Sequence, residues 1–446
     1  MSKQRIQLSD HFTYSRLLRF VLPCIGTMLF TSIYGIVDGL CVSNFVGKTA
    51  FAAVNLIMPL PMLLGTIGFM LGTGGSAIVG ITLGEGDQKK ADRYFTLFLL
   101  AALVSVSVLA VLGIVFLRPI AVLLGAKGEL LDYAVRYGRI LMVSLPTFAL
   151  QNMFQSFFVT AEKPHLGFWF TVGAGCTNMV LDVLMVGIWG WGVEGAAIAT
   201  FISQLVGGVL PVFYFIDRSN SSRLHLCKTS FYSKVLRDAC INGSSELMTN
   251  LSMSLVNILY NYQLLRLAGE NGVAAYGVIM YAAFLFVAVF VGYAVGSAPI
   301  VSFHYGARNH AEVHNLYRKS LRLIGGSSIA MLAAGEALAR PLGQIFVGYD
   351  EALLAMTVRA FRIYSFSFLL AGVAILGSSF FTALNDGLTS ALISFLRTLV
   401  FQIAAVLLLP LVLELDGIWL SIVFAETMAV LVTTVFLLAK RKKYGY

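Results

Sequence analysis

The sequence predicts an all-α membrane protein with twelve transmembrane helices arranged in two homologous six-helix halves. Three observations lead to this class: an apolar composition, a one-sided distribution of basic residues and an internal repeat. Of the 446 residues, 58% are hydrophobic and 12% are charged, and the mean hydropathy is +0.84. An average soluble domain carries about 25% charged residues. A lipid bilayer solvates such an apolar surface directly, whereas water does not.

The apolar residues form long runs that are separated by polar, glycine or proline breaks. A helix needs about 20 residues to cross a bilayer, so twelve spans fit the chain. A segment exposed to lipid must satisfy its own backbone hydrogen bonds, and this favours helices. The runs predict spans at 17–42, 51–82, 94–117, 131–160, 166–188, 193–216, 238–265, 273–304, 317–338, 354–382, 388–412 and 417–439.

The basic residues lie mainly on one side of the predicted membrane. With the N-terminus in the cytoplasm, 21 Lys and Arg residues fall in inner connections and 5 in outer ones. This bias predicts that both termini are cytoplasmic, and it requires an even number of spans. It also explains the net charge of +9 without nucleic acid as a partner. The outer residues are Lys48, Arg118, Lys127, Arg266 and Arg340.

An internal repeat divides the chain into two halves. At a shift of 222 residues, five separated segments match without gaps, and the matching positions include Gly74 with Gly296, Gly84 with Gly306, and Arg118-Pro119 with Arg340-Pro341. We expect an N-terminal six-helix lobe at 1–217, a cytoplasmic linker at 218–238 and a C-terminal six-helix lobe at 239–446. Six spans per half make the repeats parallel, and such halves usually enclose a substrate path. The alternative is a duplication that builds only a scaffold.

Four polar residues within spans of the first half define the candidate site. They are Asp38, Asn178, Asp182 and Thr200, and their positions along the spans predict a similar depth. A carboxylate inside the membrane is costly and normally has a partner or a function. Two carboxylates with neutral oxygen donors suit Na⁺, and two nearby carboxylates also suit a shared proton. The alternative is two unrelated acids, each satisfied locally.

The second half lacks these residues at the equivalent positions, so the sequence predicts a site in the first half alone. It carries other charges, namely Glu246 near the inner end of its first span and the neighbours Arg397 and Glu426, for which we expect an ion pair. These three are candidates for an auxiliary role. Pro23 lies in the same span as Asp38, and we expect it to act as a hinge because proline removes a helical hydrogen bond.

The chain resembles the multidrug and toxic compound extrusion (MATE) family. The residues that carry the resemblance are the segment from Pro23 to Asp38, the run GTGGSAIVGITLGEGD at 72–87, Asn178 with Asp182, and GVEGAAIAT at 192–200. The resemblance implies a bacterial inner-membrane antiporter that exchanges H⁺ or Na⁺ for organic, mostly cationic, compounds. It further implies that Asp38, Asn178, Asp182 and Thr200 bind the coupling ion, as in prokaryotic members with a cation site in this lobe.

Other functions agree less well with the sequence. A lipid-linked saccharide flippase of the same superfamily remains the alternative, although such proteins often have a cationic cavity and Arg397 is the main basic residue near mid-depth. No HExxH, GxSxG or Walker motif is present, so we expect neither an enzyme nor a cofactor. We expect a monomer that is embedded in the bilayer and acts on small organic cations.

Overall fold

The computed structural model describes residues 6–46 and 48–446, except for the side chains at positions 36, 38–45, 48 and 51. The described chain is helical and contains no strand, which confirms the all-α prediction. The first half consists of α1 (Tyr14–Val46), α2 (Lys48–Ile57), α3 (Pro59–Gly84), α4 (Gln88–Leu123), α5 (Gly128–Thr160), α6 (Pro164–Asp182), the π-helix η1 (Val183–Ile188), α7 (Gly192–Gln204), the π-helix η2 (Leu205–Val209) and α8 (Leu210–Ile216).

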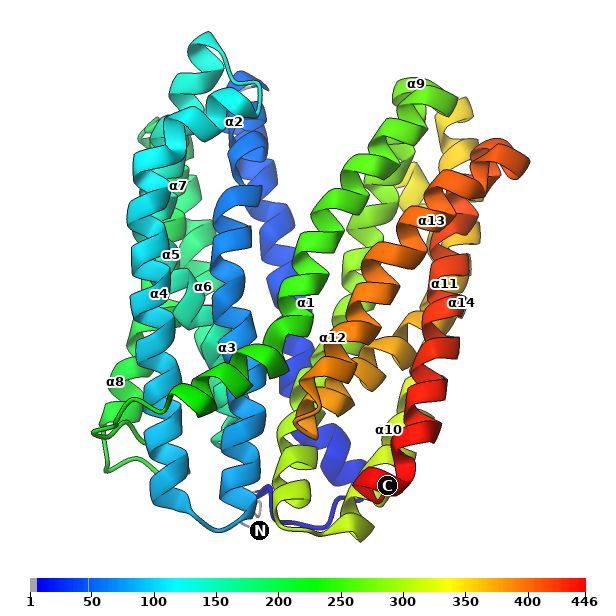
Figure 1. Ribbon diagram of the computed structural model, residues 1–446. Helices are drawn as coiled ribbons and strands as arrows, with labels where there is room; N and C mark the ends of the chain where they lie inside the picture. Colours follow the sequence, from blue (N-terminus) through cyan, green and yellow to red (C-terminus); the bar gives the residue numbers. More distant parts are fainter. Residues whose placement is uncertain (1–5, 47) are drawn as a thin grey trace.

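The second half consists of α9 (Ser233–Gly306), α10 (His310–Val347), α11 (Glu351–Ala383), α12 (Gly387–Phe395), the π-helix η3 (Leu396–Val400), α13 (Phe401–Leu408) and α14 (Pro410–Tyr444). Figure 1 shows the two halves as separate groups of long helices, with both chain ends at the same end of the molecule. We call this the terminus end. The domain boundaries stay predictions, but α9 begins at Ser233, inside the segment expected to be a linker.

The observed helices account for all twelve predicted spans. Ten helices in the described chain are long and apolar enough to cross a membrane. One of them, α9, holds two predicted spans because the backbone leaves the helical region at Gly269, where φ is 63°. The remaining span is α5, whose apolar part is interrupted by the amides Gln151, Asn152 and Gln155. Gln151 and Asn152 are buried, so they face the protein interior rather than lipid.

The two halves meet closely at the terminus end because glycines allow α3 and α9 to approach. A Cβ atom added to Gly84 would lie 2.0 Å from the carbonyl oxygen of Phe303. One added to Gly306 would lie 2.1 Å from the carbonyl oxygen of Ile81. Real Cβ atoms are not found this close to backbone, so only glycine fits at either position without a shift of a helix.

These contacts obey the repeat found in the sequence. A shift of 222 residues converts the contact of Gly84 with Phe303 into the contact of Gly306 with Ile81. Gly80 contacts Ser302, its own equivalent at this shift, and an added Cβ would lie 2.3 Å from the Ser302 hydroxyl oxygen. The pseudo-two-fold axis therefore passes between α3 and α9 at this level, in agreement with parallel repeats.

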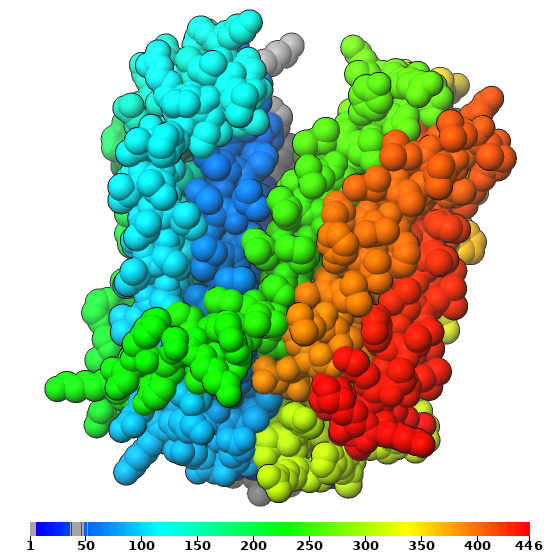
Figure 2. All heavy atoms as spheres, viewed as in Figure 1, coloured from blue at the N-terminus to red at the C-terminus, as the bar shows by residue number. Residues whose placement is uncertain are grey.

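The opposite end of the molecule is open. Figure 2 shows the surface hollowed between the two halves at the end remote from the termini, while the halves are in contact toward the terminus end. The structure is therefore a two-lobed arrangement that is closed on one side and open on the other.

The segment 6–13, which precedes α1, lies across the terminus end and contacts both halves. The backbone N–H of Leu8 donates a hydrogen bond of 3.0 Å to the Glu162 carboxylate, between α5 and α6. The backbone N–H of Phe12 donates one of 2.9 Å to the Glu312 carboxylate on α10. Because both carboxylates are buried, these hydrogen bonds help to hold the two halves together where α3 meets α9.

We predict that Gly84→Ala or Gly306→Ala separates the two halves at the terminus end. The added methyl group would overlap backbone of the other half, and the two helices must move apart to relieve the overlap. The measurement is the distance between spin labels on the exposed positions Lys89 and Arg308 in a cysteine-free background. We expect this distance to increase.

The matched control is Gly326→Ala, because an added Cβ at Gly326 meets no atom within 4 Å. An unchanged distance distribution in both glycine variants would show that the contact between α3 and α9 does not set the separation of the halves.

Candidate functional site

The candidate site is built on the last turn of α6. Asn178 and Asp182 lie one helical turn apart and therefore share a face. Both are buried, with exposed fractions of 2% and 0%. At Asp182 the α-helix ends and continues as the π-helix η1. Single turns of π-helix are rare and frequently occur at functional sites, where they change the direction of nearby side chains.

The face of α6 that carries these residues packs against α1. A Cβ atom added to Gly175, one turn before Asn178, would lie 2.5 Å from the Phe30 ring and 3.2 Å from the Tyr34 ring. Position 38 follows Tyr34 by one turn on α1, next to the part of α6 that carries Asp182. The side chain of Asp38 lies outside the described residues, so its approach to Asp182 stays a prediction.

Thr200 lies on α7, and α1, α6 and α7 contact each other in all three pairs. The predicted residues therefore come from three helices that the fold brings together. Thr200 is half-buried, and its hydroxyl donates a hydrogen bond of 3.0 Å to the carbonyl oxygen of Ala196. This hydrogen bond uses the hydroxyl proton and leaves the oxygen lone pairs for a cation.

The sequence reasoning missed Gln204 as a site residue. It lies one turn after Thr200, at the end of α7, where the π-helix η2 begins. It is 9% exposed, and its amide oxygen has no hydrogen-bond partner among the described residues. A buried acceptor in this position normally has a partner. The signal in the sequence was its spacing of four residues from Thr200.

The donor chemistry of the candidate residues fits a small cation. They offer a buried carboxylate at Asp182, amide groups at Asn178 and Gln204 and a hydroxyl at Thr200. Na⁺ and other hard cations prefer oxygen ligands of these kinds. A proton also fits, because protonation would remove the charge of a carboxylate that has 0% exposure.

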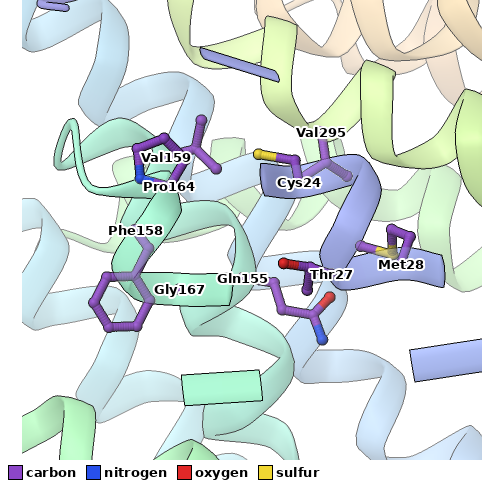
Figure 3. A pocket seen from close by; sticks show the side chains of 9 residues that line it. All are labelled: Cys24, Thr27, Met28, Gln155, Phe158, Val159, Pro164, Gly167 and Val295. Carbon is purple, nitrogen blue, oxygen red and sulfur yellow. The ribbon is translucent and has the colours of Figure 1, made fainter. Parts of the chain in front are cut away.

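Pro23 lies where α1 passes from one half to the other. Before it, Tyr14 packs against Lys319 of α10, and after it Gly26 packs against the Phe168 ring of α6. A small pocket lies next to this point, lined by Cys24, Thr27 and Met28 of α1 together with residues of α5, α6 and α9 (Figure 3). A helix that lacks one hydrogen bond and borders free space can bend, and a hinge at Pro23 stays a prediction.

The auxiliary candidates of the second half do not form one group. Arg397 of η3 and Glu426 of α14 form an ion pair with an N–O distance of 2.8 Å. Glu246 lies on α9, near the contact of Gly243 with Met70. Its carboxylate forms no hydrogen bond or ion pair with any described residue, and the structure does not bring it to the Arg397–Glu426 pair.

The fold is that of a membrane protein with two pseudo-symmetric lobes. The family model MatE matches the chain twice, at residues 23–184 and at 247–408. The two matches cover most of the chain and correspond to the two halves. The chain belongs to the MatE family, which confirms the resemblance found in the sequence.

The chain is also similar to individual proteins. It is 22% identical to the "Multidrug export protein MepA" of Staphylococcus saprophyticus over 94% of this chain and 92% of that protein. A solved structure described as the "outward-facing conformation of a multidrug resistance MATE family transporter of the MOP superfamily" superposes with a TM-score of 0.93 at 22% identity, covering 100% of this chain and 99% of that one. A MATE crystal structure in the "straight conformation" superposes with a TM-score of 0.92, at the same identity and coverage. At this identity the structural likeness establishes the fold.

We predict that Gly175→Ala destabilises the protein and weakens cation binding at the site. The methyl group would overlap the Phe30 and Tyr34 rings and push α1 away from α6. Overpacking of this kind costs about 1–3 kcal/mol. The measurement is the thermal unfolding midpoint with and without Na⁺, at constant ionic strength.

Gly173→Ala is the control on the same helix, since its added Cβ would make only an ordinary contact of 3.9 Å with Val206. Equal midpoints and equal responses to Na⁺ in the two variants would contradict the prediction.

Proposed function

We propose that the protein is a secondary active antiporter that exchanges Na⁺ or H⁺ for organic, mostly cationic, compounds. The observation that carries the proposal is the buried carboxylate of Asp182 beside Asn178, on a helix that packs against α1. A charged group at this depth is costly for stability, so its presence in a transporter fold favours a functional role. The multidrug export proteins to which the chain is similar support the substrate class.

Coupling follows from the location of the site. α1 carries position 38 near the candidate site and contacts the second half through Val21 and Cys24, which pack against Gly296. A cation that changes how α1 packs on α6 would therefore alter the contact between the two halves. A ligand shifts a conformational equilibrium only by its difference in affinity for the two states. We infer that the cation binds one state of α1 more tightly and that this difference drives exchange.

The orientation completes the proposal. From the excess of basic residues at the terminus end we infer that this end faces the cytoplasm. The structure, closed at the terminus end and hollowed at the other, would then be open to the outside (Figure 2). Alternating access would require the contact between α3 and α9 to separate, which makes the glycines of this contact part of the inner gate.

The flippase alternative has weaker support. A cavity that binds anionic lipid-linked substrates needs uncompensated positive charge, and Arg397 is neutralised by Glu426. The buried residues of the candidate site provide negative charge and oxygen atoms instead. The neutralised Arg397 therefore favours a cationic substrate over an anionic lipid-linked one.

We predict that Asp182→Asn abolishes gradient-driven export. The amide preserves the shape of the side chain but removes the negative charge that binds the coupling ion. The experiment measures transport of a fluorescent organic cation into inverted vesicles, with a Na⁺ gradient and a pH gradient imposed separately. We expect wild-type protein to respond to one gradient and Asp182→Asn to neither.

Asp132→Asn is the matched control because Asp132 is exposed on α5, and it should transport at the wild-type rate. Asp38→Asn is expected to behave like Asp182→Asn. Wild-type rates of coupled export by Asp182→Asn would refute the proposed coupling site, provided that both variants insert equally well.

A further inference from the structure

The second half contains a buried ion pair in a part of the fold that is equivalent to the candidate site. The Arg397 guanidinium donates hydrogen bonds of 2.8, 2.9 and 3.0 Å to the two carboxylate oxygens of Glu426. The Glu426 side chain is 3% exposed and that of Arg397 is 16% exposed. A planar guanidinium that binds both oxygens of a carboxylate is the most specific geometry for such a pair.

Tyrosine side chains lie beside this ion pair. Tyr364 lies near both charges, and Tyr260 lies near Glu426. The Tyr260 ring stacks on the Tyr276 ring, with centroids 5.1 Å apart and an interplanar angle of 6°. The hydroxyl of Tyr260 is buried and has no hydrogen-bond partner among the described residues. The cluster is therefore polar, charged and largely closed to solvent.

The cluster lies on the three helices that the repeat makes equivalent to α1, α6 and α7 of the candidate site. Tyr260 occupies the position of Asp38 at the shift of 222 residues, and Glu426 occupies that of Gln204. Arg397 lies in the helix equivalent to α6, which carries Asn178 and Asp182. The sequence predicted no equivalent of the cation site in the second half but did predict an Arg397–Glu426 pair, and the structure shows that pair at the equivalent place.

We propose that Arg397 is a tethered cation. Its guanidinium supplies the positive charge in the second half, whereas a mobile ion supplies it in the first half. The statement about the mobile ion depends on the proposed function. In the second half the guanidinium neutralises Glu426 permanently, so this half binds no exchangeable cation. Coupling then involves the first half alone, and the Glu426 pocket becomes a monovalent cation site when the guanidinium is removed.

The physical basis is the cost of an unpaired charge in the membrane. Removing one partner of a buried ion pair is strongly destabilising because the remaining charge has no compensation. A small cation that enters the vacated space would restore this compensation. The space left by an arginine side chain has the shape of a guanidinium ion, and the Tyr260 hydroxyl adds an oxygen donor nearby.

The test is binding of free guanidinium ion to purified Arg397→Ser. The thermal unfolding midpoint is measured with guanidinium chloride at low millimolar concentrations, with choline chloride replacing it at constant ionic strength. Arg397→Ser should have a lower midpoint than wild type. Guanidinium should raise it saturably by roughly 3 °C, because a ligand that binds only the folded state stabilises it.

The double variant Arg397→Ser/Glu426→Gln keeps the space but removes the carboxylate, so it should show no guanidinium response. Arg397→Lys keeps a tethered cation and should also show none. If Arg397→Ser is unstable without ligand, guanidinium in the growth medium and buffers should restore its yield but not that of the double variant. No response in Arg397→Ser, or an equal response in the double variant, would overturn the proposal.

The binding test does not depend on transport, so it separates this proposal from the proposed function. A wild-type protein that transports nothing under either gradient refutes the antiporter, whereas a lack of guanidinium binding by Arg397→Ser refutes only the tethered cation.

The number of coupling ions exchanged per substrate molecule gives a second readout. We expect Arg397→Gln to exchange one more coupling ion per substrate molecule than wild type does. This stoichiometry is measured by finding the ion gradient and the opposing substrate gradient at which net transport stops.

Discussion

The close approach of α3 and α9 is the contact on which the arrangement of the two halves depends. Gly84 and Gly306 allow each helix to contact backbone of the other half, and Gly80 contacts Ser302 next to the pseudo-symmetry axis. Without a hydrophobic driving force between helices in lipid, such contacts gain their energy from dispersion at short range. Dispersion energy is large at contact and falls off steeply with separation. A small movement therefore loses most of it, so these contacts favour a gate with two states, closed and open.

The segment before α1 and the first turns of α1 connect this gate with the candidate site. Leu8 and Phe12 bind carboxylates in opposite halves, and α1 then crosses from the second half to the first near Pro23. Further along, Phe30 and Tyr34 pack on α6 at Gly175. One continuous helix therefore contacts the closed end of the molecule and the helix that carries the buried Asp182. This continuity provides a physical path by which a bound cation can bias the contact between the halves.

The two halves show how a duplicated fold can diverge at equivalent places. In the first half, Asn178, Asp182 and Thr200 provide oxygen atoms and negative charge without a basic residue among them. In the second half, Arg397 lies bound to Glu426 beside Tyr260. Both solutions address the same problem, because a buried carboxylate in the membrane needs a positive charge or a proton. The second half satisfies that requirement from its own chain, and in the proposed mechanism the first half leaves it to a mobile ion.

The sequence by itself determined the fold class, the spans and the repeat, because lipid requires long apolar helices and a duplication leaves glycines at a constant spacing. It also singled out Asn178, Asp182 and Thr200 as candidates, since polar residues stand out in apolar spans, and their role in binding a cation stays a prediction. Only the tertiary structure decided that Gly84 meets Phe303, that the amide oxygen of Gln204 is buried without a partner among the described residues, and that the Arg397 guanidinium binds both carboxylate oxygens of Glu426. These features depend on which helix faces meet, and hydropathy carries little information about facing residues when almost every residue of a span is apolar.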